Sequence, residues 1–259
     1  MDPEVNNWMQ LIFRWIHVVA GVAWIGHLYF FNWVNAHFAK TMDGPTKRMV
    51  VPELMPRALY WFRWGAAWTW VSGILLAGLI YYMGGALFED PQAGGNAMVW
   101  LLIFLIVAAV GFVLYNLIMK SVPNLIVANI TVLVLLVATY LLFEHVGHFS
   151  GRALYTHLGA LLGTIMAGNV WMVIWPSQKK IITAIKEGTA PDPALVSLAG
   201  LRSRHNTFMS VPLIFFMISN HYPTVYGSEY RDIYAAVIMA VGFLATILLY
   251  KKSEKVKGF

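Results

Sequence analysis

The stretch AMVWLLIFLIVAAVGFVLYNLIM at residues 97–119 decides the fold class. It is apolar over about the 20 residues that an α-helix needs to cross the ~30 Å hydrocarbon core of a membrane. Other runs of similar character occur along the chain, which is 59% hydrophobic and only 12% charged. Soluble domains carry roughly 25% charged residues, and one soluble core cannot bury so many such segments. The sequence therefore predicts an all-α, polytopic integral membrane protein.

The apolar runs and the Pro and Gly residues between them predict a bundle of seven membrane-spanning helices. No long linker or second composition regime interrupts residues 1–259, so we predict a single domain. Gly159, Gly163 and Ala167 are spaced by four residues, which predicts a close approach between the fifth helix and a neighbour. The predicted spans are 9–36, 58–84, 97–119, 123–144, 153–175, 206–220 and 231–250, with Pro176 marking the end of the fifth.

Basic residues follow the first, third, fifth and seventh predicted helices, whereas the opposite loops are acidic or mixed. The positive-inside rule then places the N-terminus outside and the C-terminus in the cytoplasm. The formal net charge of +6 is explained by these cytoplasmic loops, so no nucleic-acid partner is expected. The chain has no cysteine, which excludes disulfides, thiolate-held iron–sulfur clusters and covalently attached haem c.

Five of the eight histidines fall near the predicted outer surface of the membrane: His17, His145, His148, His157 and His221. A single interfacial histidine is more often a solvated or hydrogen-bonded side chain than a metal ligand. Gathered at one depth, however, imidazoles are typical ligands of haem or metal ions. Zinc or copper would need several ligands converging on one point. Histidines on four helices instead favour axial ligation of one or two b haems, with His17 as the first choice.

His17, Gly21 and Trp24 lie at i, i+4 and i+7, and therefore on one face of the first helix. A glycine one turn from an imidazole leaves space for a flat macrocycle, which an aromatic ring can enclose. When these three residues are considered by themselves, packing of a second helix against Gly21 explains their spacing equally well.

Polar residues flank a short apolar run in RSRHNTFMSVPLIFFMISNHYP at residues 202–223. Arg202 and Arg204 either bind an anion or act as positive-inside anchors. Together with RWIHVVAGVAWIG at 14–26 and GNVWMVIWPSQKK at 168–180, this segment resembles the membrane domain of PuuD-type bacterial urate oxidases over essentially the whole chain. The motif at 14–26 is also similar to HemJ-type protoporphyrinogen oxidases.

The resemblance implies a multi-pass oxidoreductase of the bacterial inner membrane that oxidises a purine such as urate and passes electrons to a periplasmic cytochrome c. In that family a cytochrome c domain follows an eighth helix. Neither is present in this sequence, so we expect either that a separate periplasmic cytochrome c or another electron-transfer subunit accepts the electrons, or that the protein has another task. The residues marked by the resemblance are His17, Trp24, Asn169, Trp171, Pro176, Arg204, His205, Asn206, Asn220, His221 and Pro223, and we expect Arg204, His205, Asn206 and Asn220 to be catalytic.

Two other functions are compatible with the sequence. The first is a haem b electron-transfer subunit of a respiratory-type complex without substrate chemistry of its own. The second is a metal transporter or assembly scaffold. Most of the 13 methionines lie singly among apolar residues, where packing explains them.

Overall fold

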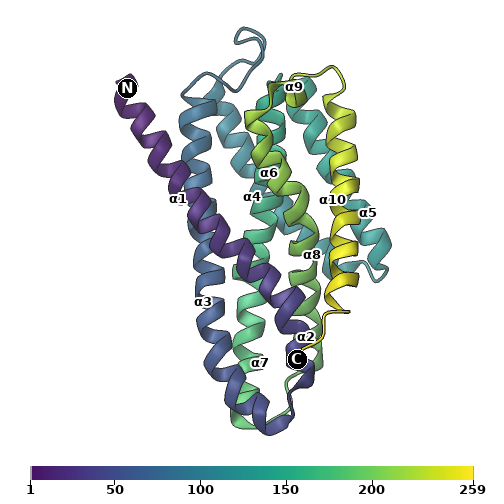
Figure 1. Cartoon of the computed structure of the whole chain (residues 1–259). Helices are drawn as coiled ribbons and strands as arrows, with labels where there is room; N and C mark the ends of the chain where they lie inside the picture. Colours follow the sequence, from purple (N-terminus) through teal and green to yellow (C-terminus); the bar gives the residue numbers. More distant parts are fainter. Residues whose placement is uncertain (1, 259) are drawn as a thin grey trace. The chain divides into compact units, whose positions relative to one another are not determined.

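A computed structural model describes residues 2–258, and Figure 1 shows a chain of helices joined by loops, of which the one before α4 is long. Apart from an isolated β-bridge between Phe88 and Phe149, the described residues pair no strands, which confirms the all-α class. The α-helices are α1 (Pro3–Tyr29), α2 (Ala36–Thr41), α3 (Gly44–Ala77), α4 (Ala97–Ser121), α5 (Leu125–Leu141), α6 (Gly151–Gly168), α7 (Trp175–Glu187), α8 (Pro193–Ile218), α9 (Pro223–Tyr226) and α10 (Arg231–Ser253).

Several of these helices continue through segments of different pitch. The π-helical segments are η1 (Phe30–Asn35), η2 (Gly78–Tyr82), η3 (Leu142–Val146) and η4 (Asn169–Ile174), and a 3₁₀ segment, η5, covers Ser219–His221. A π-helix bonds each residue to the fifth along instead of the fourth, so its turns are wider than those of an α-helix.

Six helical stretches are long and apolar enough to cross a membrane, which indicates a multi-pass membrane protein. The seventh predicted span, 206–220, lies mostly on α8, which carries a polar cluster in its middle and is not among the six. The seven-helix count and the orientation therefore stay predictions. The six stretches are Pro3–Thr41, Gly44–Tyr82, Ala97–Ser121, Leu125–Val146, Gly151–Glu187 and Arg231–Ser253.

Several predicted helix ends are wrong. The helix predicted at 58–84 already begins at Gly44, where Asp43 caps it by accepting a hydrogen bond from the Thr46 amide at 2.8 Å. Hydrogen bonds from Thr46 lower the pKa of the Asp43 carboxyl. The predicted end at Pro176 is also wrong, because α6, η4 and α7 form one continuous helical stretch. Proline lacks an N–H and crowds the carbonyl one turn earlier, and the wide π-helical turn before Pro176 relieves that crowding.

The chain divides into two compact units. Unit 1 comprises residues 2–14, 73–165 and 212–239, and unit 2 comprises 15–72, 166–211 and 240–258. Each boundary falls inside a helix, so α1, α3, α6, α8 and α10 contribute residues to both units. The single domain expected over 1–259 stays a prediction.

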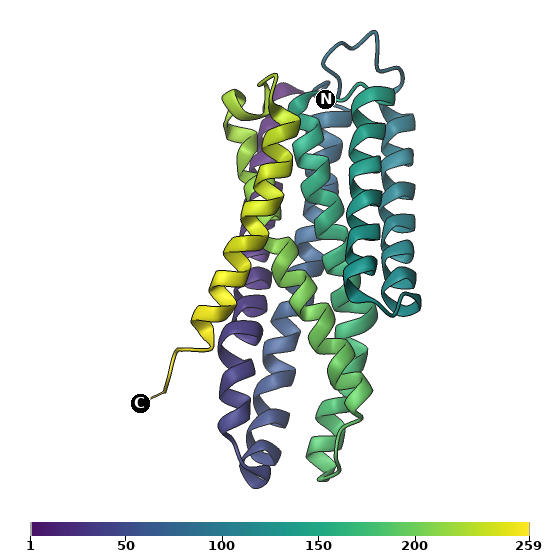
Figure 2. The same ribbon diagram turned by 90° about the vertical axis from the view of Figure 1, so that its right-hand side faces the viewer.

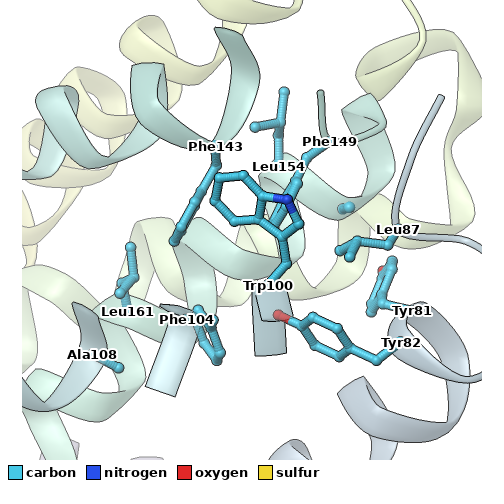
Figure 3. Packing of buried hydrophobic residues seen from close by; sticks show 11 residues of the cluster. Tyr81, Tyr82, Leu87, Trp100, Phe104, Ala108, Phe143, Phe149, Leu154 and Leu161 are labelled. Atoms are coloured by element: carbon cyan, nitrogen blue, oxygen red, sulfur yellow. The ribbon is translucent and has the colours of Figure 1, made fainter. Parts of the chain in front are cut away.

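Aromatic side chains fill the core of unit 1, as Figure 3 shows. Phe143 and Phe149 stack with ring centroids 5.0 Å apart, and the Trp100 ring meets Phe149 edge-on at 5.4 Å. Within this unit, α4 and α5 lie side by side in both Figure 1 and Figure 2. The core residues come from η2, α4, η3, α6 and the loops beside them.

The small residues of α6 do bring it close to a neighbour. A Cβ atom added at Gly159 would lie 2.9 Å from Met217 Cε and 3.3 Å from Phe216 Cβ, both on α8. A Cβ atom at Gly163 would lie 3.4 Å from Leu213 Cδ1. The close approach predicted from the glycine spacing is therefore confirmed for these two positions.

In unit 2, α1 packs along α3. A Cβ atom at Gly65 would lie only 2.9 Å from the backbone nitrogen of Trp24 and 3.1 Å from the carbonyl oxygen of Ala20. Further along the same pair of helices, Phe31 of η1 meets Phe62 edge-on at 5.3 Å. The absence of a side chain at Gly65 thus allows the two backbones to approach each other.

Candidate functional site

A polar cluster in unit 1 surrounds Asn220, one of the four residues that the sequence predicts to be catalytic. We call Tyr81, Arg152, Thr156 and Asn220 the Asn220 cluster. The Asn220 Oδ1 atom accepts hydrogen bonds from Tyr81 Oη at 2.8 Å and from Arg152 Nε at 2.9 Å. Its Nδ2 atom donates to Thr156 Oγ1 at 2.9 Å. The carboxamide therefore holds side chains from η2 and α6 in fixed positions.

Arg152 gives this cluster its positive charge. Its guanidinium carbon lies 5.9 Å from the centroid of the Tyr81 ring, and within the described residues the guanidinium donates a hydrogen bond only to Asn220. No ion pair among the described residues includes Arg152. Arg231, also in unit 1, is by contrast paired with Glu144 at 3.0 Å and Glu89 at 3.2 Å. A guanidinium has five N–H donors, so Arg152 retains donors suited to an anionic ligand.

His157 is the most buried of the predicted ligands, and both of its ring nitrogens are engaged. Nδ1 lies 2.7 Å from the Ala153 carbonyl oxygen and therefore carries the proton, and Nε2 accepts from Tyr82 Oη at 2.7 Å. The rings of Phe104 and Phe149 approach the imidazole at 4.8 and 5.1 Å. In this structure His157 is a hydrogen-bonded histidine inside the aromatic core of unit 1.

The three other predicted ligands in unit 1, His145, His148 and His221, have exposed side chains. His145 lies in η3, whereas His148 follows the helix end in a left-handed conformation with φ of 50°, so the two do not share a helix face. Within residues 2–258 no three His, Asp or Glu side chains form a group that could hold a metal ion.

His17 lies in unit 2, half-buried against α3. Its Nδ1 atom is 3.2 Å from Ser72 Oγ, and that hydroxyl already donates to the Trp68 carbonyl oxygen at 2.5 Å. The hydroxyl is therefore the acceptor, Nδ1 carries the proton, and Nε2 keeps its lone pair. Fixing the Nδ1 proton in this way is how proteins present Nε2 to a metal.

The face of α1 that carries His17 packs against α3. Gly21 faces Thr69 at 3.9 Å, measured from an added Cβ atom, and Trp24 is 2% exposed beside Gly65. The sequence pattern did not single out His27, whose Nδ1 atom lies 2.7 Å from the Ala23 carbonyl oxygen and which therefore also presents Nε2 as an acceptor. A histidine inside a predicted membrane span is itself a signal of function, and this signal could have identified His27.

The other three predicted catalytic residues lie on α8 in unit 2. Asn206 is fully buried, accepts a hydrogen bond from Asn169 Nδ2 at 2.9 Å and donates to the Met166 carbonyl oxygen at 3.0 Å. His205 is half-buried, and Arg204 is exposed with its guanidinium carbon 5.4 Å from the Tyr250 ring centroid. Asn220 is thus in unit 1, while Arg204, His205 and Asn206 are in unit 2.

Further polar residues of unit 2 connect α8 with η1 and α10. Asn32 Nδ2 donates to Ser203 Oγ at 2.8 Å, and its Oδ1 atom accepts from Tyr250 Oη at 2.9 Å. Tyr29 Oη and Ser210 Oγ are 3.0 Å apart. Because Ser203 and Ser210 lie two turns apart, this face of α8 is polar, as expected of a helix buried among others rather than exposed to lipid.

Sequence reasoning did not assign a binding role to two arginines, Arg152 and Arg63. Arg63 lies inside the predicted span 58–84, and a charge within a span is itself a signal of function. Arg152 falls between the predicted spans 123–144 and 153–175, and in the structure it lies in the first turn of α6.

Comparison with protein families places the chain in a known family. Residues 3–258 match the family model described as urate oxidase N-terminal, which is nearly the whole chain. No curated protein and no solved structure matches significantly.

Proposed function

The chain belongs to the urate oxidase N-terminal family, and from this membership we propose that it is a membrane oxidoreductase that oxidises an anionic purine such as urate. The observation that carries the proposal is Arg152, whose guanidinium is oriented by Asn220 and has no carboxylate partner in the described chain. The Asn220 cluster is therefore our candidate for the purine site.

The chemistry of the cluster suits such a ligand. Urate is a flat anion with N–H and C=O groups along its edge, and a guanidinium provides two parallel donors to such acceptors. The buried Tyr81 ring, whose centroid lies 5.9 Å from the guanidinium carbon, supplies an apolar wall of the cluster, while Asn220 accepts a hydrogen bond from the guanidinium and donates one to Thr156. Few polar groups in fixed positions beside an aromatic wall are typical of small-molecule sites.

We further propose that unit 2 holds a b-type haem through His17. His17 fits this group, because the Ser72 hydroxyl fixes the proton on His17 Nδ1 and leaves His17 Nε2 as the ligating atom. His157 fits less well, because a haem iron would have to displace Tyr82 from Nε2. When bound, the haem would carry single electrons from the purine to a separate periplasmic cytochrome c.

The test is anaerobic addition of urate to the purified protein while the reduced haem band is followed. We expect urate to reduce the haem, and Arg152→Gln to weaken the apparent affinity for urate at least tenfold. Arg57→Gln is the matched control, because Arg57 is exposed and, among residues 2–258, its ion pair is with Glu53 alone. Haem that urate cannot reduce would favour the electron-transfer subunit over the enzyme, and a protein without haem would overturn the cofactor proposal.

A further inference from the structure

Arg63 of α3 lies among aromatic side chains in unit 2. Its guanidinium carbon is 4.0 Å from the centroid of the Trp175 ring, and 5.8 Å from each of the Trp171 and Tyr60 centroids. The Trp171 indole N–H donates to the Arg63 backbone carbonyl at 3.0 Å. This hydrogen bond ties η4 to α3 and keeps the Trp171 indole beside the cation.

A second cation approaches the same indole. Lys179, one turn beyond Trp175 on α7, has its Nζ atom 5.6 Å from the Trp175 ring centroid. No ion pair among the described residues includes Arg63 or Lys179, and the buried Nε atom of Arg63 has no hydrogen-bond acceptor in residues 2–258. Two positive charges therefore lie 4.0 and 5.6 Å from the Trp175 ring centroid, with no carboxylate among the described residues paired to them, which favours an anionic ligand.

The positions of Arg63 and Lys179 along their helices indicate the source of this anion. Arg63 lies just inside the predicted cytoplasmic end of the span 58–84, and Lys179 just beyond the cytoplasmic end of 153–175. Trp and Tyr residues are enriched at this depth, and basic pockets there bind lipid headgroups. Apolar side chains close by in sequence, Trp61 and Met172, are 60% and 69% exposed and offer a surface for acyl chains.

We propose that Arg63, Trp175 and Lys179 bind the phosphate of an anionic phospholipid at the cytoplasmic surface of the membrane. The planar guanidinium donates two hydrogen bonds to phosphate oxygens, and the ammonium group adds a point charge. Trp175 holds both cations on its ring system, so that they are oriented before the lipid arrives.

Native mass spectrometry of the detergent-purified protein tests this inference. With phosphatidylglycerol and phosphatidylcholine supplied in equal amounts, we expect one retained phosphatidylglycerol per chain. Arg63→Gln and Lys179→Gln should each reduce that retention at least tenfold. Lys180→Gln is the matched control, because Lys180 is the exposed neighbour of Lys179 and contacts no ring in the described chain. Thermal unfolding of each variant shows whether it is folded. If Arg63→Gln is not folded, Lys179→Gln tests the proposal.

Three results would overturn the proposal. The first is equal retention of the two lipids by the unmodified protein. The second is retention by Lys179→Gln that matches the Lys180→Gln control. The third is displacement of phosphatidylglycerol by millimolar inorganic phosphate, which would assign the cations to a small soluble anion instead of a lipid.

Discussion

Asn206 illustrates how single polar residues hold helices together inside unit 2. Its carboxamide accepts from Asn169 and donates to the Met166 carbonyl oxygen, and none of its surface is exposed. Replacing it with leucine removes both bonds and leaves the Met166 carbonyl oxygen without that donor. An unmade buried hydrogen bond costs about 1–3 kcal/mol.

We therefore expect Asn206→Leu to lower the thermal unfolding midpoint of the purified protein. Thr131→Val is the control, because within the described part of the chain the Thr131 hydroxyl on α5 bonds only to the Val127 carbonyl oxygen of its own helix, at 2.9 Å. An Asn206→Leu protein as stable as this control would contradict the structural role of the carboxamide.

His17→Ala tests the cofactor proposal at the level of one atom. Removal of the imidazole takes away the Nε2 lone pair that the Ser72 hydrogen bond leaves available, so the haem absorption band should be lost or strongly reduced. His145→Ala should keep the band, because the side chain of His145 is 69% exposed and, of the described carboxylates, Glu144 alone lies within salt-bridge distance, at 3.8 Å. Loss of the band in His145→Ala but not in His17→Ala would instead identify His145 as the haem ligand.

Asn220→Asp tests the charge of the purine site. The new carboxylate would lie against Arg152 Nε, where Asn220 Oδ1 now accepts at 2.9 Å, and would neutralise the guanidinium. We expect urate affinity to fall at least tenfold, which corresponds to about 1.4 kcal/mol, with little change in thermal stability. Urate titration of both proteins measures this, and unchanged affinity would place the purine elsewhere.

At the scale of helices, Gly65 controls the distance between α1 and α3. An added methyl group would meet backbone atoms of Trp24 at 2.9 and 3.2 Å, and backbone cannot move aside as a flexible side chain can. Overpacking of this kind costs about 1–3 kcal/mol. Gly65→Ala should therefore lower the unfolding midpoint.

Gly111→Ala is the matched substitution on α4, because nothing lies within 4 Å of its added Cβ atom. Alanine is the better helix former by about 0.5–1 kcal/mol, so this variant should be as stable as the original protein or more so. A similar loss of stability at both glycines would show that helix packing is not the cause.

Helix existence is easier to predict from this sequence than helix ends. The run at 97–119 is apolar throughout, and α4 follows it closely. A span prediction measures apolar length, whereas a helix continues wherever backbone hydrogen bonds form. The charged residues of 44–57 and the proline at 176 therefore suggested ends at which the helices of the structure continue.

The site residues differ in how easily they can be recognised from the sequence. Asn206 and Asn220 stand out as polar residues beside an apolar run. The cations Arg63 and Arg152 draw their significance from Trp175 and Tyr81, which are distant in the chain, and one sequence does not reveal such pairs.

For the whole molecule, the distribution of Lys and Arg predicts an outside N-terminus and a cytoplasmic C-terminus. The chain has no cysteine, so single cysteines can be introduced without background labelling. In intact cells we expect a membrane-impermeant maleimide to label Gln92→Cys, in the loop before α4, and to spare Asp192→Cys, in the loop before α8. Asp192→Cys should become reactive once the cells are broken, and labelling of Asp192→Cys alone in intact cells would invert the topology.

The π-helical segments have a consequence for how the chain tolerates changes in length. Deleting one residue from an ordinary α-helix rotates everything that follows by about 100°, and so turns lipid-facing residues inward. A π-helical turn holds one surplus residue, so a deletion within Asn169–Ile174 would convert it to regular α-helix and leave Trp175 and the residues after it near their original bearing. Proteins with one residue deleted within η1, η2, η3 or η4 should therefore still fold. A one-residue deletion in the middle of α4 should instead disrupt folding.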